Sequence, residues 1–274
     1  MSQSGVPIDL PPPPPLRPSG VGEILSAAFD LYARYWRTLI PLVAVVVVPL
    51  TILQYALDAV LWEDVVRTTA SGGVEIVGST EQAWQAAAGG FVLGLITLFV
   101  TLALVGALAW AAAGALVGRE PDLGESYRVG VARMWSVLLV SLLTGLAVAG
   151  GFILLIVPGL IFLARFAVAV PALVVEGKRG RAALSRSWNL VIGHSWPVFG
   201  TLLVAGLIAG AVSGVLTVPF SGPWFVRGLL AGIGSAITTP FTGLVFSLVY
   251  FDLRVRKDGL DVAGLERELR AAAP

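Results

Sequence analysis

The chain has 274 residues, of which 57% are hydrophobic and only 13% are charged, and its mean hydropathy is +0.88. A soluble domain carries about 25% charged residues, so this composition excludes an ordinary soluble protein and favours a membrane protein. The net charge of +1 gives no basic field for nucleic acid, and the absence of cysteine excludes disulfides, thiol catalysis and thiolate metal sites.

Residues 1–20 are polar and contain the proline run Pro11–Pro15. Such a run favours a solvated polyproline II segment without a packed partner. The segment also lacks the basic start and apolar core of a secretory signal. We expect a disordered, Pro-rich cytoplasmic N-terminus over residues 1–20, and favour a spacer over a ligand for an aromatic-lined groove.

A membrane domain is predicted over residues 21–256, because a helix of about 20 apolar residues crosses a bilayer core of ~30 Å. The expected spans cover residues 38–57, 89–116, 135–157, 159–175, 197–219 and 228–251. The fourth span is the least regular, because it is short and contains Arg165. The pair Pro158 and Gly159 is typical of a turn and predicts the boundary between the third and fourth spans. Residues 257–274 are expected to form a cytoplasmic tail.

Positive charge is concentrated in alternate loops. Fifteen of the 18 lysines and arginines lie in residues 1–37, 118–134, 177–196 and 252–274. Because positive residues stay on the cytoplasmic side, both termini are predicted to be inside a cytoplasmic (inner) membrane. The stretch Ser71–Thr80, with acidic residues around it, is predicted to be a polar outer loop.

A motif recurs before the first, third and fifth spans, in residues 24–36, 123–135 and 184–196. Each copy is an amphipathic stretch that ends in a basic residue, one spacer and a tryptophan. The basic residue and tryptophan of the three copies are Arg34 and Trp36, Arg133 and Trp135, and His194 and Trp196. Apolar residues three and four apart predict a helix lying on the membrane surface, with its tryptophan at headgroup level.

The fold class that follows is all-α: a polytopic membrane protein with six transmembrane helices, built as three repeats of an amphipathic interfacial helix plus a transmembrane hairpin. The surface helices either only anchor each hairpin or also grip anionic lipid or a partner; the sequence favours anchoring.

Three stretches resemble a known family. They are LRPSGVGEILSAAFDLYARYWR at the start (residues 16–37), PGLIFLARFAVAVPALVVEGKRGRAALSRSWNLVIGHSW in the centre (residues 158–196) and YFDLRVRKDGLDV near the end (residues 250–262). These include Arg165, Glu176, Arg186, Tyr250, Asp252 and Arg254. The chain is similar through them to bacterial integral membrane proteins resembling the membrane domain of glycerophosphoryl diester phosphodiesterases. The resemblance implies a multi-helix membrane domain of largely undefined function. We expect the catalytic barrel of some relatives to be absent, and no phosphodiesterase activity.

Catalytic groups are scarce. His194 is the single histidine, and arginines occupy the matching positions of the other two copies, so a basic surface group explains it better than a catalytic imidazole. A phosphate-cradling loop and a dinucleotide-binding motif are both missing. We expect no enzyme, no catalytic or metal-binding residues and no cofactor.

Arg165 is the one intramembrane charge, and such residues are functional candidates by default. It could reach the outer headgroups, line a path for an anion or lipid phosphate, or pair with acidic residues after the first span. Those acidic residues are Asp58, Glu63 and Asp64. Glu176 is expected to pair with Arg181 or Arg186.

The expected function is therefore that of a non-enzymatic, lipid- or partner-interacting module in membrane or envelope processes. Its expected partners are membrane lipids, with another membrane or envelope protein as a further option and no nucleic acid. The alternative is a secondary transporter or lipid flippase that uses Arg165 in a polar pathway.

Overall fold

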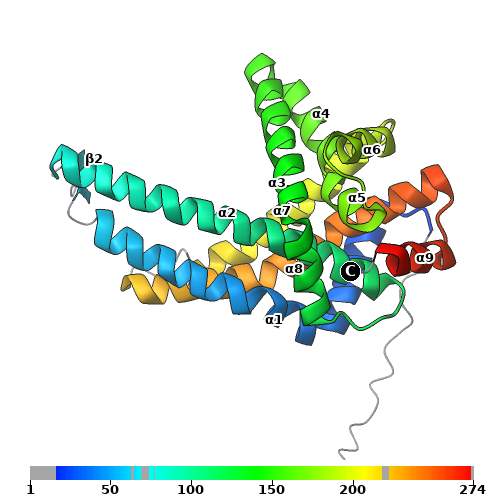
Figure 1. The fold of residues 1–274 in the computed structure, drawn as a ribbon, viewed down its shortest axis with the longest axis horizontal. Coiled ribbons are helices and arrows are strands. Elements are labelled where there is room, and N and C mark those ends of the chain that lie inside the picture. The colour runs from blue at the N-terminus through cyan, green and yellow to red at the C-terminus, as the bar shows by residue number, and fades with distance from the viewer. Residues whose placement is uncertain (1–16, 63–64, 69–73, 77, 218–221, 273–274) are drawn as a thin grey trace, which may run out of the picture.

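The computed structural model describes residues 17–62, 65–68, 74–76, 78–217 and 222–272, which are almost entirely helical (Figure 1). The helices are α1 (Val21–Trp62), α2 (Thr80–Leu116), α3 (Leu123–Leu154), α4 (Ile156–Phe166), α5 (Ala169–Glu176), α6 (Arg181–Val191), α7 (Ser195–Thr217), α8 (Trp224–Asp258) and α9 (Val262–Ala272). Two short strands, β1 (Val66–Thr68) and β2 (Val74–Ile76), pair antiparallel with Arg67 opposite Glu75. Most of the Pro-rich segment and much of the predicted polar loop lie outside the described residues.

In the part of the chain that the structure describes, six helical segments are long and apolar enough to cross a membrane, which confirms the predicted all-helical, multi-pass class. They are α1, α2, α3, α7, α8 and the pair α4 and α5 taken together. The helices extend beyond the predicted spans. The first begins at Val21 rather than near residue 38, and the last continues to Asp258. Polar stretches next to a span add turns to the same helix because helix propagation costs little once a helix has formed.

The turn between the third and fourth spans is not at Pro158 and Gly159. The chain reverses at Leu155, which is extended (φ −167°, ψ 157°), and Pro158 lies in the first turn of α4. Proline is tolerated there because the first backbone N–H groups of a helix have no intrahelical acceptor. Gly159 instead allows close packing, since a Cβ at Gly151 of α3 would lie 2.9 Å from its Cα.

The predicted surface helices are separate elements only in the third copy. There α6 ends before Gly193, whose φ of +85° suits glycine, and α7 begins at Ser195. Alanine occupies the matching positions, Ala33 and Ala132. In the first copy α1 continues with a kink at Tyr35, and in the second α3 runs on without a break.

The helices converge at one end of the molecule, which we call the polar end. Here α1, α3 and α7 begin, α2, α5 and α8 end, and α6 and α9 pack. The fully buried side chains concentrate towards it, among them Leu31, Leu173, Tyr250, Phe251 and Leu265. Away from it the molecule divides into two arms: α1, α2, α7 and α8 extend in one direction, and the α3–α4 hairpin points in another (Figure 1).

Both described chain ends are fixed at the polar end. The Ser19 backbone N–H donates to Asp252 Oδ1 at 2.6 Å, and Arg256 Nη2 donates to the Ser19 carbonyl at 2.8 Å. Ser19 is therefore held against the end of α8. The predicted tail forms α9, which buries Leu265 and Leu269 completely.

Candidate functional site

Glu176 is the centre of a buried polar cluster at the polar end. Its carboxylate accepts hydrogen bonds from Arg186 Nε at 2.9 and 3.0 Å and from the Tyr250 hydroxyl at 2.9 Å. The Lys178 ammonium lies 3.1 Å from the same carboxylate, and Arg254 Nη1 lies 3.5 Å from it. Residues from α5, α6 and α8 thus meet on one carboxylate.

Arg254 extends the cluster to α9. Its Nη1 and Nη2 donate to the two oxygens of Glu268 at 2.8 and 2.9 Å, which is a bidentate pair. Its Nε donates to Asp258 at 2.8 Å, and Asp258 also pairs with Arg186. The Arg254 side chain is only 7% exposed, so its charge depends on these partners.

Local backbone structure brings Glu176 to this position. It is the last residue of α5, which ends because Gly177 adopts a left-handed conformation with φ of +67°. Arg133 of α3 donates to the carbonyls of Leu173 and Val174 in the last turn of α5. A cation at a helix C-terminus is favourable because the carbonyl dipoles there are negative.

The cluster is electrically balanced, since three cations face three carboxylates: Lys178, Arg186 and Arg254 with Glu176, Asp258 and Glu268. Burial disfavours the charged form of Arg186, but its hydrogen bonds to Asp258 and Glu176 outweigh this and raise its pKa. Arg186 therefore stays protonated, and its charge is paired with the carboxylates of Glu176 and Asp258.

A second site is a cavity of about 280 Å³ between the start of α1, the start of α7 and the end of α8. His194, Asp252 and Arg256 line it together with Ser19. Asp252 is already paired, with Arg256 Nε at 2.8 Å and with Ser19. His194 Nδ1 is buried without a hydrogen-bond partner among the described residues.

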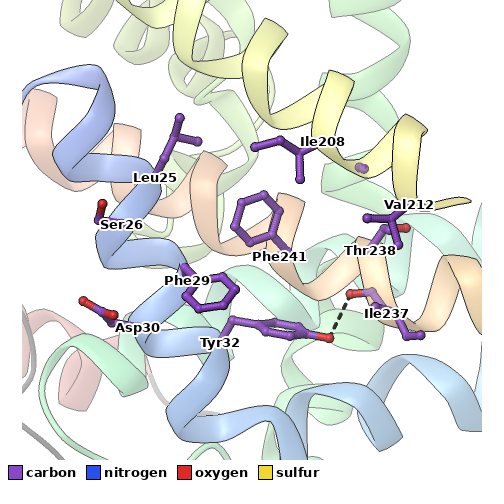
Figure 2. Close-up of a pocket in the computed structure, with 11 residues that line it drawn as sticks. Leu25, Ser26, Phe29, Asp30, Tyr32, Ile208, Val212, Ile237, Thr238 and Phe241 are labelled. Atoms are coloured by element: carbon purple, nitrogen blue, oxygen red, sulfur yellow. Dashed lines mark hydrogen bonds between the residues drawn. The ribbon is translucent and has the colours of Figure 1, made fainter.

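The largest of the cavities described here is an apolar groove of about 460 Å³ between α1, α7 and α8 (Figure 2). One face of α1 supplies Leu25, Phe29 and Tyr32, which point towards Ile208 of α7 and Phe241 of α8 (Figure 2). The groove opens to the side, since Phe29 is 62% exposed.

Polar groups of the groove lie at its edge or are already bonded. Ser26 and Asp30 line the edge on α1, and their side chains point away from the apolar interior (Figure 2). The Tyr32 hydroxyl donates to the Ile237 carbonyl at 3.0 Å. The interior therefore offers apolar contact and little hydrogen bonding.

The three motif tryptophans, Trp36, Trp135 and Trp196, are exposed. The ring of Trp135 meets Phe99 edge-on at 5.4 Å, and that of Trp196 meets Phe199 edge-on at 6.1 Å. The Arg34 guanidinium lies 5.6 Å from the Tyr35 ring centre. None of these contacts joins one copy of the motif to another.

Arg165 lies against α6. Its guanidinium carbon is 4.1 Å from the centre of the Trp188 ring, and its carbonyl accepts a hydrogen bond from the Ser187 hydroxyl at 2.7 Å. The expected approach to the acidic residues after the first span is not seen: Asp58 makes no described contact with it, and Glu63 and Asp64 lie outside the described residues. Because α4 ends at Phe166 and α6 folds back beside it, the indole of Trp188 lies against the guanidinium. Arg165 lines none of the cavities described above.

The structure thus joins four of the residues singled out from the sequence: Glu176, Arg186, Tyr250 and Arg254. The expected pairing of Glu176 is made by Arg186, whereas Arg181 is exposed. Sequence reasoning missed Glu268 and Asp258. The signal for Glu268 was the spacing of Leu265 and Leu269, which predicts an amphipathic helix. Among the described residues, no three histidine, aspartate or glutamate side chains are grouped closely enough to hold a metal ion.

Fold and composition together define a multi-pass helical membrane protein. Over residues 124–252, from α3 to α8, the chain is similar to a family described as a domain of unknown function (DUF7847). That description names no activity and no glycerophosphoryl diester phosphodiesterase. No curated protein and no solved structure gives a significant match.

Proposed function

We propose that this protein is a non-enzymatic membrane module that holds one acyl chain of a bilayer lipid in the groove between α1, α7 and α8. The observation that carries the proposal is the groove itself, an apolar cavity of about 460 Å³ that opens sideways from helices suited to cross a membrane.

The chemistry of the groove fits a hydrocarbon chain. Leu25, Phe29, Ile208 and Phe241 offer apolar surface. The hydroxyls of Tyr32 and Thr238 also line the groove, but both already donate to backbone carbonyls. Burying a polar ligand here would leave its hydrogen bonds unmet, at a cost of about 2–7 kcal/mol for each unpaired group. A lipid chain has no such groups, and lipid is the solvent around these helices.

The lining residues of α7 suggest which way the bound lipid points along this helix. Val198 and Thr201, which line the cavity near His194, lie on the same helical face as Ile208 and Val212, which line the groove. Buried Ala205 separates the two sites. We place the lipid headgroup towards the polar end, beside Ser26 and Asp30, and the chain towards the opposite end of α7.

The same proposal includes the membrane and the orientation. The concentration of lysine and arginine in the loops of the polar end supports a cytoplasmic (inner) membrane with that end and both termini in the cytoplasm. The three recurring motifs support three related units of lead-in helix and hairpin. The motifs shared with the glycerophosphoryl diester phosphodiesterase membrane domain support a distant relationship to it.

The test is to fill the groove. Ile208→Trp places an indole inside it, whereas Leu207→Trp makes the same change at the neighbouring exposed residue of α7, which does not line the groove. Both proteins are purified in detergent with a phospholipid of defined chain length, and bound lipid is counted by native mass spectrometry. We expect Ile208→Trp to lose one bound lipid and Leu207→Trp to keep it. Equal lipid counts in folded samples of both variants would refute the proposal.

A further inference from the structure

Arg165 is an isolated cation in an otherwise apolar segment. It is the single charged residue between Ile156 and Val175, and its Nε is buried without a hydrogen-bond partner among the described residues. The residue as a whole is half-buried, and removing part of an ionised group from water without a paired charge is costly. The structure supplies a Trp188 ring beneath the guanidinium but no described carboxylate beside it.

The surroundings hold this guanidinium in a fixed place. Phe162, Phe166 and Trp188 pack as a cluster, with ring centres 5.5 to 6.2 Å apart. The Ser187 hydroxyl ties α6 to the Arg165 carbonyl, so the helix that carries the indole is anchored to the residue that carries the charge. Stacking on an aromatic face leaves the edge N–H groups of an arginine free to bind in the plane.

The position suits a ligand at the membrane surface. Helix α6 is amphipathic and is followed by the exposed Trp196, features of an element at headgroup level. Arginine presents a planar fork of donors that matches the oxygens of a phosphate. The missing partner is therefore an anion that approaches from the side of α4 and α6.

We propose that Arg165, stacked on Trp188, is a binding point for a phosphate group at the junction of α4 and α6. The phosphate group completes the charge pairing that the described residues leave open. This site lies on different helices from the α1–α7–α8 groove, so either site can exist without the other.

The first experiment compares two lipids by native mass spectrometry of the detergent-purified protein: dioleoyl-phosphatidylglycerol and dioleoylglycerol, which has the same chains and no phosphate. We expect Arg165→Gln to lower the occupancy of the phosphate-bearing lipid by about tenfold, the size expected for losing a charge-assisted hydrogen bond. Binding of dioleoylglycerol should not change. The matched control is Arg227→Gln. The guanidinium carbon of Arg227 also lies over an aromatic ring, 5.6 Å from the centre of the Tyr55 ring, and Arg227 is at the start of α8, away from the polar end.

A second arm identifies the source of the phosphate. Inorganic phosphate is titrated at constant ionic strength against the wild-type protein and Arg165→Gln. Binding that depends on Arg165 in this arm supports the site with a soluble phosphate as ligand, whereas dependence confined to the lipid arm supports a headgroup. If neither arm depends on Arg165, or if Arg227→Gln has an equal effect, the proposal is wrong.

If Arg165→Gln does not fold, a second variant that keeps the charge of Arg165 tests the proposal. Trp188→Leu retains Arg165 but removes its aromatic support, and we expect severalfold weaker phosphate binding with normal elution as a folded protein. Wild-type binding in folded Trp188→Leu would equally overturn the proposal.

Discussion

The polar end and the two arms of this protein are stabilised in different ways. At the polar end, Glu176 and Arg254 are buried and each contacts several partners from other helices. At the tip of the α3–α4 arm, Ile153 is 87% exposed and Leu154 is 74% exposed. The first region is specified by directional contacts within the chain, whereas the second relies on a hydrocarbon environment to cover its side chains.

The difference between the polar end and the arms predicts where a substitution lowers the stability of the protein most. A buried ion pair loses more when one partner is removed than an exposed pair does, because the remaining charge stays desolvated. A lipid-facing apolar side chain has no partner to lose. We therefore expect mutational costs to fall from the polar end towards the tips of the arms.

The largest expected effect is at the centre of the buried cluster. Glu176→Ala removes the acceptor of Arg186 and Tyr250, and we expect a loss of about 3–5 kcal/mol in the free energy of unfolding. The measurement is unfolding of the purified protein by denaturing detergent, followed by circular dichroism. Glu266→Ala is the control, because its pair with Arg270 is exposed and should contribute less than about 0.5 kcal/mol. Similar losses in the two variants would remove the contrast between buried and exposed pairs.

A smaller effect is expected where α2 and α3 cross. A Cβ at Gly130 would overlap the Ala103 carbonyl oxygen, so Gly130→Ala must move one helix and should cost about 1–3 kcal/mol. A Cβ at Gly210 of α7 would meet nothing within 4 Å, so Gly210→Ala should be neutral or stabilising by up to about 1 kcal/mol. Thermal unfolding of both variants in the same detergent compares them. If Gly130→Ala is as stable as Gly210→Ala, the close crossing of α2 and α3 is wrong.

The smallest effect is expected at the groove. Tyr32→Phe removes a hydroxyl that donates to the Ile237 carbonyl, and we expect a loss of about 0.5–1.5 kcal/mol. Tyr55→Phe removes a hydroxyl that has no hydrogen-bond partner among the described residues, and it should change stability less. Unfolding midpoints of the two variants test this order, and a reversed order would argue against the bond between α1 and α8.

The class of the protein was readable from the sequence because a membrane span depends on local composition alone. Long charge-free stretches and the alternating basic loops predicted six spans, and six suitable helices are present. Element ends were less accessible. Pro158 was interpreted as a turn residue, yet a proline in the first turn of a helix and a proline in a loop are both ordinary.

Contacts between distant residues could not be predicted. The hydrogen bond between Tyr250 and Glu176 joins positions 74 residues apart, and no local pattern announces it. The groove could not be predicted either. In the sequence, Ile208 and Phe241 do not differ from residues that face lipid, and only the packing of α1, α7 and α8 brings them together. Arg165 was recognised because a lone charge in an apolar run is conspicuous, but its partner Trp188 depends on how α6 folds back.

Gly193, with its left-handed backbone conformation, breaks the helix between α6 and α7, so the tilt of α7 is not fixed by the position of α6. Helix α6 is fastened to its neighbours by Arg186 and Ser187. We therefore expect α7 to change its tilt in bilayers of different thickness while α6 stays in place. The lead-in stretch of α3 is continuous with its span and leans together with it, whereas that of α1 is joined to its span by the kink at Tyr35. A change in bilayer thickness would therefore move the two sides of the polar end unequally.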